Sequence, residues 1–188
     1  MNKEQFWAII DKARESAGSW EDMFGPLVDE LSQLESSDIL HWGQIFGLYQ
    51  KHSYKNKLWA AAYVINGGCS DDGFDYFRGW LTAQGKAVFL KSLSDPDSLA
   101  DVDACEGGSV DFEEMLSVAP EAFFRKLSLD SDYNRFYEEL DKRPLSDEEN
   151  ADILSEIVYG DDIDIEWNED DAEAMRVLLP KLCDAFDW

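Results

Sequence analysis

The chain has few of the residues that build the common catalytic and metal centres. Only two histidines and three cysteines occur among 188 residues, and no Cys-x-x-Cys pair is present. This scarcity argues against zinc-ribbon and thioredoxin-like sites. The sequence also lacks a phosphate-binding glycine loop, a Gly-x-Ser-x-Gly elbow and a His-Glu-x-x-His pair. Because Cys69, Cys105 and Cys183 are widely spaced, we expect reduced, buried thiols and a reducing compartment.

Long apolar runs are absent as well. No stretch approaches the ~20 apolar residues that cross a bilayer. The first residues, Met1 to Trp7, do not contain the apolar core of a secretory signal. We therefore expect a soluble, cytoplasmic protein that makes no membrane contact.

Basic residues are scarce, and their shortage is uneven along the chain. Sixteen Lys and Arg stand against 41 Asp and Glu, a formal net charge of −25. Residues 1–94 carry 12 acidic and 9 basic side chains, whereas residues 95–188 carry 29 acidic and 7 basic side chains. Such a field repels phosphate backbones and disfavours direct nucleic-acid binding. It attracts basic protein surfaces, although an acidic balance that only maintains solubility is the simpler alternative.

Apolar and aromatic residues are plentiful, which distinguishes the chain from a disordered acidic polypeptide. Hydrophobic residues make up 45% and aromatic residues 13%. Apolar positions recur at helical spacing from Phe6 onwards. The sequence therefore predicts a mostly α fold: one compact multi-helix domain over residues 1–188, with few or no strands and an acidic C-terminal half from about residue 95.

Several boundaries follow from capping residues, glycines and prolines. We expect Ser19 to cap a second helix, Ser36 or Ser37 to cap a third, and Pro120 to interrupt a later helix. Pro180 should kink or divide a final helix over residues 170–186. The alternation of Ile163 to Trp167 favours a short extended piece. The stretch from Cys105 to Ser109 is expected to be the most flexible.

The most informative segment is the corner at residues 67–72. Gly67 and Gly68 end an apolar helix, and Ser70, Asp71 and Asp72 are typical of the start of the next helix. Capping accounts for every residue type there. A functional alternative makes Cys69 a nucleophile activated by the helix N-terminus, although no histidine motif supplies a base. The candidate residues of this possible site are Cys69, Ser70, Asp71, Asp72 and Arg78.

A second candidate lies in the acidic run at residues 161–173. Its exposed carboxylates are candidates for binding a basic partner, namely Asp161, Asp162, Asp164, Glu166, Glu169, Asp170 and Asp171. The spacing from Asp162 to Glu173 also resembles a calcium loop. However, Trp167 stands at the position where such a loop needs glycine for its sharp turn. We therefore predict neither a metal nor a cofactor.

The segment Trp59 to Leu81, WAAAYVINGGCSDDGFDYFRGWL, resembles a bacterial family known as domain-of-unknown-function family 4240. The similarity begins at Phe6-Trp7 and extends through Asp95 to Leu99. It touches Cys105-Glu106 and returns at Trp167 to Asp170 and Leu179 to Phe186. Residues 129–165 depart from it in being more acidic and less rich in proline. The resemblance implies a compact bacterial domain with no established activity.

Two functions of different classes remain after these observations. The preferred hypothesis is a non-enzymatic interaction module that binds a basic protein partner. Its charge resembles that of bacterial immunity proteins, which neutralise basic toxins. The alternative is an enzyme of unknown reaction with its site at the Gly67–Asp72 corner. The sequence leaves the identity of the partner and the oligomeric state open.

Overall fold

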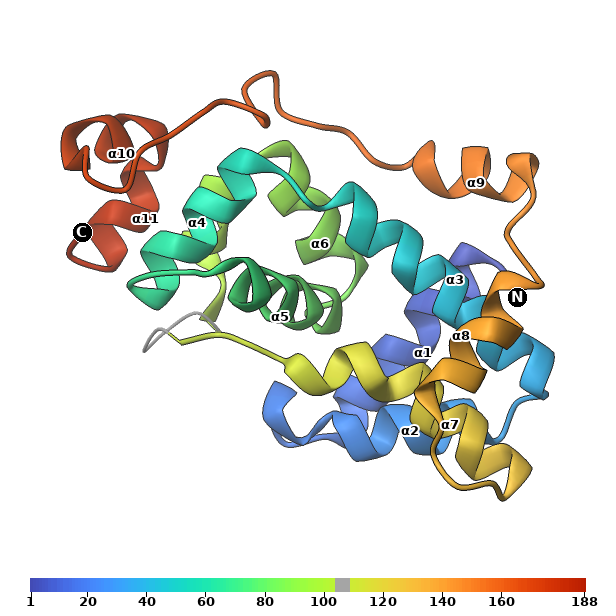
Figure 1. Ribbon diagram of the computed structural model, residues 1–188. Coiled ribbons are helices and arrows are strands. Elements are labelled where there is room, and N and C mark those ends of the chain that lie inside the picture. Colours follow the sequence, from blue (N-terminus) through green and yellow to red (C-terminus); the bar gives the residue numbers. More distant parts are fainter. Residues whose placement is uncertain (104–108) are drawn as a thin grey trace.

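Helices form along most of the described chain, as the sequence pattern predicts. The computed structural model describes residues 1–103 and 109–188, and these residues form helices joined by turns and loops, without β-strands (Figure 1). The prediction of a mostly α fold is therefore confirmed for the described residues. Of the stretch expected to be most flexible, residues 105–108 lie outside the described part of the chain.

The helices of the first hundred residues account for most of the predicted amphipathic segments. They are α1 (Lys3–Ser16), η1 (Trp20–Asp22), α2 (Phe24–Ser32), α3 (Ser36–His52), α4 (Asn56–Asn66), α5 (Asp71–Ala83), α6 (Lys86–Ser94) and η2 (Pro96–Asp101). The later helices are shorter. They are η4 (Glu113–Ser117), α7 (Val118–Leu127), α8 (Tyr133–Asp141), α9 (Asp147–Leu154), α10 (Ala172–Leu178) and α11 (Pro180–Ala185).

One contiguous hydrophobic core joins these helices. Aromatic rings of α1, α3 and α6 meet in it, and Phe6 lies 4.9 Å from Trp42 and 5.3 Å from Tyr49 between ring centroids. Helix α5 packs closely on η4 because Gly79 has no side chain. A Cβ at that position would lie 2.7 Å from the carbonyl oxygen of Phe112. The core contains residues from both halves of the chain, as expected for a single domain.

Three boundary predictions are wrong: that Pro120 interrupts a helix, that Ser19 caps α2, and that Ser36 or Ser37 caps α3. Pro26 and Pro120 both occupy the third residue of a helix, where the N–H that proline lacks would have no intrahelical partner. Pro120 thus lies in the first turn of α7 rather than interrupting a helix. Ser19 precedes only the short η1 turn, so it does not cap α2. The residue at the N-cap position of α3 is Glu35, not Ser36 or Ser37.

The prediction that Pro180 divides the last helix is confirmed, because α10 ends at Leu178 and α11 begins at Pro180. At the extended piece predicted for Ile163 to Trp167, the structure has a turn over residues 161–164 and no strand. Ile163 is buried, its carbonyl accepts a hydrogen bond from the Lys57 amide at 2.9 Å, and Trp167 is partly buried against the core. Ile165, by contrast, is exposed.

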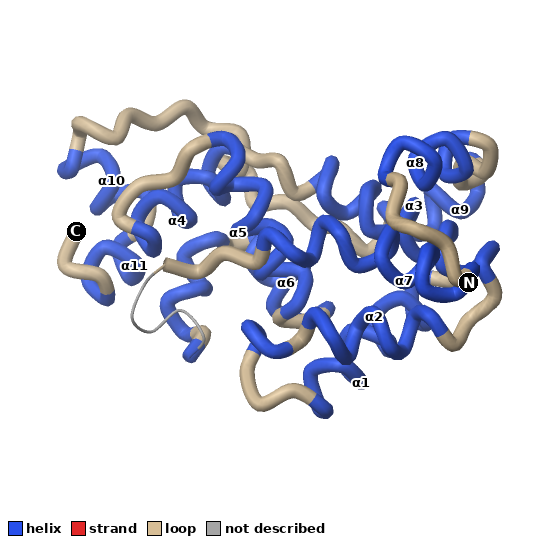
Figure 2. The backbone as a smooth tube through the Cα atoms, turned by 60° about the horizontal axis from the view of Figure 1, so that its bottom comes forward, coloured by secondary structure: helices blue, strands red, loops and turns tan. Residues whose placement is uncertain are grey.

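The segment between α9 and α10, residues 155–171, is called the strap from here on. It runs along the outside of α3, α4 and α6 and links the N-terminal end of the molecule, near α8 and α9, to the C-terminal end, near α10 and α11 (Figures 1 and 2). The strap carries all seven acids predicted to bind a partner. Its position therefore decides what those acids contact.

Candidate functional site

The Gly67–Asp72 corner has the capping geometry that its residues predict. Gly67 ends α4 in the left-handed conformation with φ 65°, and the Ser70 hydroxyl accepts a hydrogen bond from the Gly73 amide at 3.1 Å. The Trp59 indole donates to the Cys69 carbonyl at 2.9 Å, which ties the turn to α4. The capping interpretation of Gly67 and Ser70 is confirmed.

Cys69 is half-buried, and its thiol is not activated. Burial raises the pKa of Cys69 to about 11, against a weaker lowering influence of Trp59. The histidines make their contacts elsewhere. His41 lies 3.2 Å from Glu149, and His52 lies 3.3 Å from the Tyr159 hydroxyl. The raised pKa therefore disfavours the thiolate that a Cys69 nucleophile requires.

Alkylation tests this conclusion directly. With a pKa of about 11 against an ordinary value of 9.0, the thiolate of Cys69 should be about a hundredfold rarer at pH 8 than in the unfolded chain. We expect iodoacetamide to modify Cys69 at least that much more slowly in the native protein than in urea, as measured by peptide mass spectrometry. Equal rates in the two states would restore the enzyme alternative.

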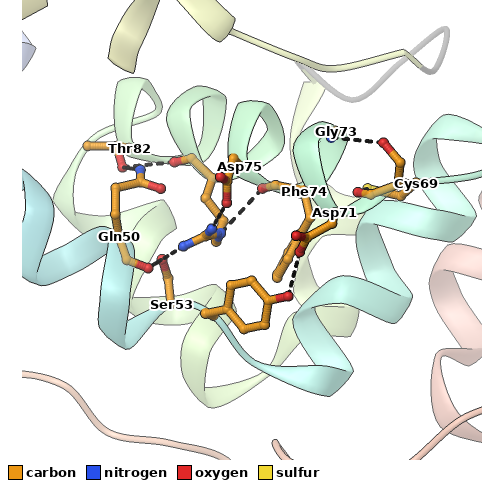
Figure 3. Close-up of polar contacts among 11 residues, drawn as sticks. Gln50, Ser53, Cys69, Asp71, Gly73, Phe74, Asp75 and Thr82 are labelled. Carbon is orange, nitrogen blue, oxygen red and sulfur yellow. Dashed lines mark hydrogen bonds and ion pairs between the residues drawn. The ribbon is translucent and has the colours of Figure 1, made fainter. Parts of the chain in front are cut away.

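Arg78 is buried and has a structural role. Its guanidinium donates to the Gln50 carbonyl in the last turn of α3 and pairs with Asp75, which lies three residues earlier on α5 (Figure 3). The guanidinium also lies 4.8 Å from the Tyr54 ring centroid, a cation–π distance. Burial lowers the pKa of Arg78, and Asp75 opposes that shift. Arg78 thus joins α5 to the C-terminal end of α3.

The two acids of the corner have different surroundings. Asp71 accepts a hydrogen bond from the Tyr54 hydroxyl at 2.6 Å, so it belongs to the same junction as Arg78 (Figure 3). Asp72 is exposed and forms no ion pair within the described residues. Ser70, Asp71 and Arg78 thus stabilise the fold. Cys69 is the candidate residue of this corner that lines a pocket in the described structure.

Two lysines of the N-terminal half form ion pairs with acids of the strap. Asp162 pairs with Lys57 at 2.6 Å, and Asp164 pairs with Lys55 at 2.7 Å. The buried Ile163 between the two acids fixes the turn against α4. These two acids, predicted to bind a partner, are therefore exposed but already engaged in intramolecular ion pairs.

The remaining acids of the strap have other surroundings. Asp171 caps α10 by accepting from the Ala174 amide at 3.0 Å. Four exposed carboxylates form no ion pair with the described residues, and these are Asp161, Glu166, Glu169 and Asp170. The described residues include no group of three or more His, Cys, Asp or Glu side chains arranged to hold a metal ion. The calcium-like spacing of residues 162–173 thus does not bring three such side chains into one group.

Two neighbouring pockets lie along the strap and share Glu166 and Trp167. The smaller, of 350 Å³, is called the aromatic pocket here and is lined by Asn56, Trp59, Tyr63, Cys69, Glu166, Trp167 and Glu169. The larger, of 580 Å³, is called the apolar pocket. Its lining includes Ile165, Met175, Val177, Leu178 and Glu173. The structure thus brings the Gly67–Asp72 corner and the acidic run, about a hundred residues apart, to one place.

A family model described as a protein of unknown function (DUF4240) matches residues 1–125. The chain belongs to the DUF4240 family. No curated protein and no solved structure matches it. The resemblance expected at residues 167–170 and 179–186 lies outside the matched range.

The residues matched by the family model form only one part of the aromatic pocket. The DUF4240 region supplies Trp59, Tyr63 and Cys69, and the strap beyond it supplies Glu166, Trp167 and Glu169. Sequence reasoning missed the three aromatic side chains of this pocket, because an aromatic residue at helical spacing is ordinarily assigned to the core. Trp167, an aromatic residue within the acidic run, was the feature of the sequence that could have indicated this pocket.

No helix in the described part of the chain combines the length and the apolar character needed to cross a membrane.

Proposed function

We propose that this protein is a non-enzymatic, cytoplasmic interaction module that binds a basic protein partner through the strap. A basic toxin, neutralised in the manner of an immunity protein, is one partner of this kind. The observation that carries the proposal is the set of exposed strap acids without an internal cation, Asp161, Glu166, Glu169 and Asp170. Glu166 lines both pockets and Glu169 lines the aromatic pocket, while Asp161 and Asp170 are their neighbours on the strap, so charge and concavity occur on the same segment.

Electrostatics supports the same proposal at longer range. A net charge of −25, concentrated in residues 95–188, speeds the approach of a basic surface and repels nucleic acid. The attraction is screened over about 8 Å at physiological salt, so close contacts determine whether the complex persists. Binding should therefore weaken as salt is added.

The alternative of an enzyme at the Gly67–Asp72 corner has less support. Burial raises the pKa of Cys69, and Arg78 and Asp71 are engaged in joining α5 to α3. The acids and the pocket nearby serve binding without requiring a reaction. The interaction proposal needs none of these groups to be reactive.

A charge-matched pair of variants tests the proposal. We expect Asp161→Asn with Asp170→Asn to weaken a basic partner about five- to tenfold at low salt, because two exposed attractive charges are lost. Asp162 and Asp164 are left unchanged, because they already pair with Lys57 and Lys55 and their loss would also alter contacts of the strap. The partner is captured from host lysate, identified by mass spectrometry, purified and titrated by calorimetry at two salt concentrations.

The control is Asp130→Asn with Asp141→Asn. Asp130 precedes α8 and Asp141 is its last residue, at the opposite end of the molecule from α10 and α11 (Figure 1), and the pair gives the same change in net charge. The control should bind nearly as the wild type does. Equal weakening by both pairs, or a captured partner that is not basic, contradicts the proposal.

A further inference from the structure

We infer that the aromatic pocket receives one cationic side chain, arginine or lysine, from the partner. This inference rests on the proposed function and adds the residue that is recognised and its place on the surface. The aromatic pocket is where aromatic rings, carboxylates and open space meet.

The lining of the pocket suits a cation. Three aromatic side chains contribute to it, and the Tyr63 and Trp167 rings lie 5.4 Å apart at 60°. Phe74 stacks on Trp59 at 5.1 Å and 7°, so Phe74 fixes the plane of that indole. The π-faces of Trp and Tyr attract guanidinium and ammonium groups, and Trp does so most strongly.

Carboxylates complete the site. Glu166 and Glu169 line the pocket, are exposed, and form no ion pair with the described residues. The same lining includes no Lys, Arg or His from the described residues. A cation entering here gains two attractive charges and meets no competing one, whereas an anion would meet two repulsive charges. The charge of the lining therefore selects for a cation.

The size of the pocket favours a side chain over a large ligand. At 350 Å³, it lies near the lower end of the range of ~300–1,000 Å³ found for small-molecule sites. Glu166 and Trp167 also line the apolar pocket, where Ile165 is 45% and Val177 84% exposed. A partner segment that places a basic residue in the aromatic pocket thus brings a neighbouring apolar residue over Ile165 and Val177.

Titration with a small probe tests the pocket without the partner. The probe is N-acetyl-arginine amide, and its neutral control is N-acetyl-norleucine amide at matched ionic strength. Trp59 is a suitable reporter because its indole N–H bonds the Cys69 carbonyl at the pocket wall. We expect saturable shifts of the Trp59 and Trp167 indole signals in proton–nitrogen NMR spectra with the arginine probe, and at least fivefold weaker binding of the neutral probe.

Glu166→Gln is the decisive variant, because Glu166 is exposed and holds no internal partner in the described chain. It should weaken the arginine probe about threefold to fivefold, whereas Glu173→Gln, which changes only the apolar pocket, should leave it within about twofold. Trp167→Leu should weaken the probe further, and its thermal transition reports whether it folds.

The two proposals can fail separately. Shifts that do not saturate, or that are equal for the neutral probe and for Glu166→Gln, overturn the inference about the pocket. Partner binding that still depends on Asp161 and Asp170 would in that case leave the proposed function standing. Saturable arginine binding, together with partner binding that ignores Asp161 and Asp170, would instead support the pocket and overturn the role of the outer acids.

Discussion

Replacing Glu156 with alanine is expected to destabilise the protein by about 3 kcal/mol, because this strap residue completes a network inside the helical core. Its carboxylate accepts from the fully buried Tyr49 hydroxyl and from the Trp7 indole, and pairs with Lys86 at 2.6 Å. The Glu156 side chain is only 12% exposed. Its removal leaves the Tyr49 hydroxyl without its acceptor and loosens the start of the strap.

Urea unfolding, followed by circular dichroism, measures this loss. The matched control is Asp152→Ala, which breaks the more exposed pair with Lys3 and should change stability by less than about 1 kcal/mol. Hydrogen exchange should rise over residues 155–165 in the Glu156 variant. A stability equal to that of Asp152→Ala would show that the buried network contributes little.

The second large effect is expected for Asp97→Ala, at about 2–4 kcal/mol. The Asp97 side chain lies on η2 and is 7% exposed. It accepts from the Lys181 amide at 3.1 Å and from the Leu182 amide at 3.0 Å. A carboxylate at a helix start satisfies N–H groups that have no intrahelical partner. Asp97 therefore joins α11 to η2, and its loss leaves two amides unpaired near the core.

Limited proteolysis and urea unfolding together test this prediction. Asp101→Ala breaks only the exposed contact with Lys181 at 3.6 Å and is the control, with an expected loss below about 1 kcal/mol. Asp97→Asn retains one acceptor oxygen and should fall between the two. Cleavage near α10 and α11 should become faster in Asp97→Ala. Identical behaviour of Asp97→Ala and Asp101→Ala would contradict the capping role.

Both anchors matter for the proposed binding surface. Glu156 holds one end of the strap, and Asp97 holds α11, which follows α10 beyond the other end of the strap. Trp167 and Glu166 lie between these two points, so the shape of the aromatic pocket depends on them. Variants at Glu156 or Asp97 should therefore also weaken partner binding, but only in proportion to their loss of folded structure.

The sequence by itself determined the local features of this protein. Helical periodicity, the left-handed Gly67, the Ser70 cap and the division at Pro180 depend on residues within one or two turns of one another. The charge imbalance is also a property of composition. The same local rules were less informative at Ile163 to Trp167, where alternation suggested an extended piece but the chain begins with a turn, exposes Ile165 and forms no strand.

The tertiary structure alone decided which acids remain free and where the pockets form. Asp162 and Asp164 meet lysines about a hundred residues earlier, and Arg78 meets the end of another helix. Local pattern carries no information about such pairs, because an exposed and a paired aspartate follow the same sequence rules. Contacts between distant segments form only when the shared core positions them. The free strap acids and the aromatic pocket are therefore consequences of packing.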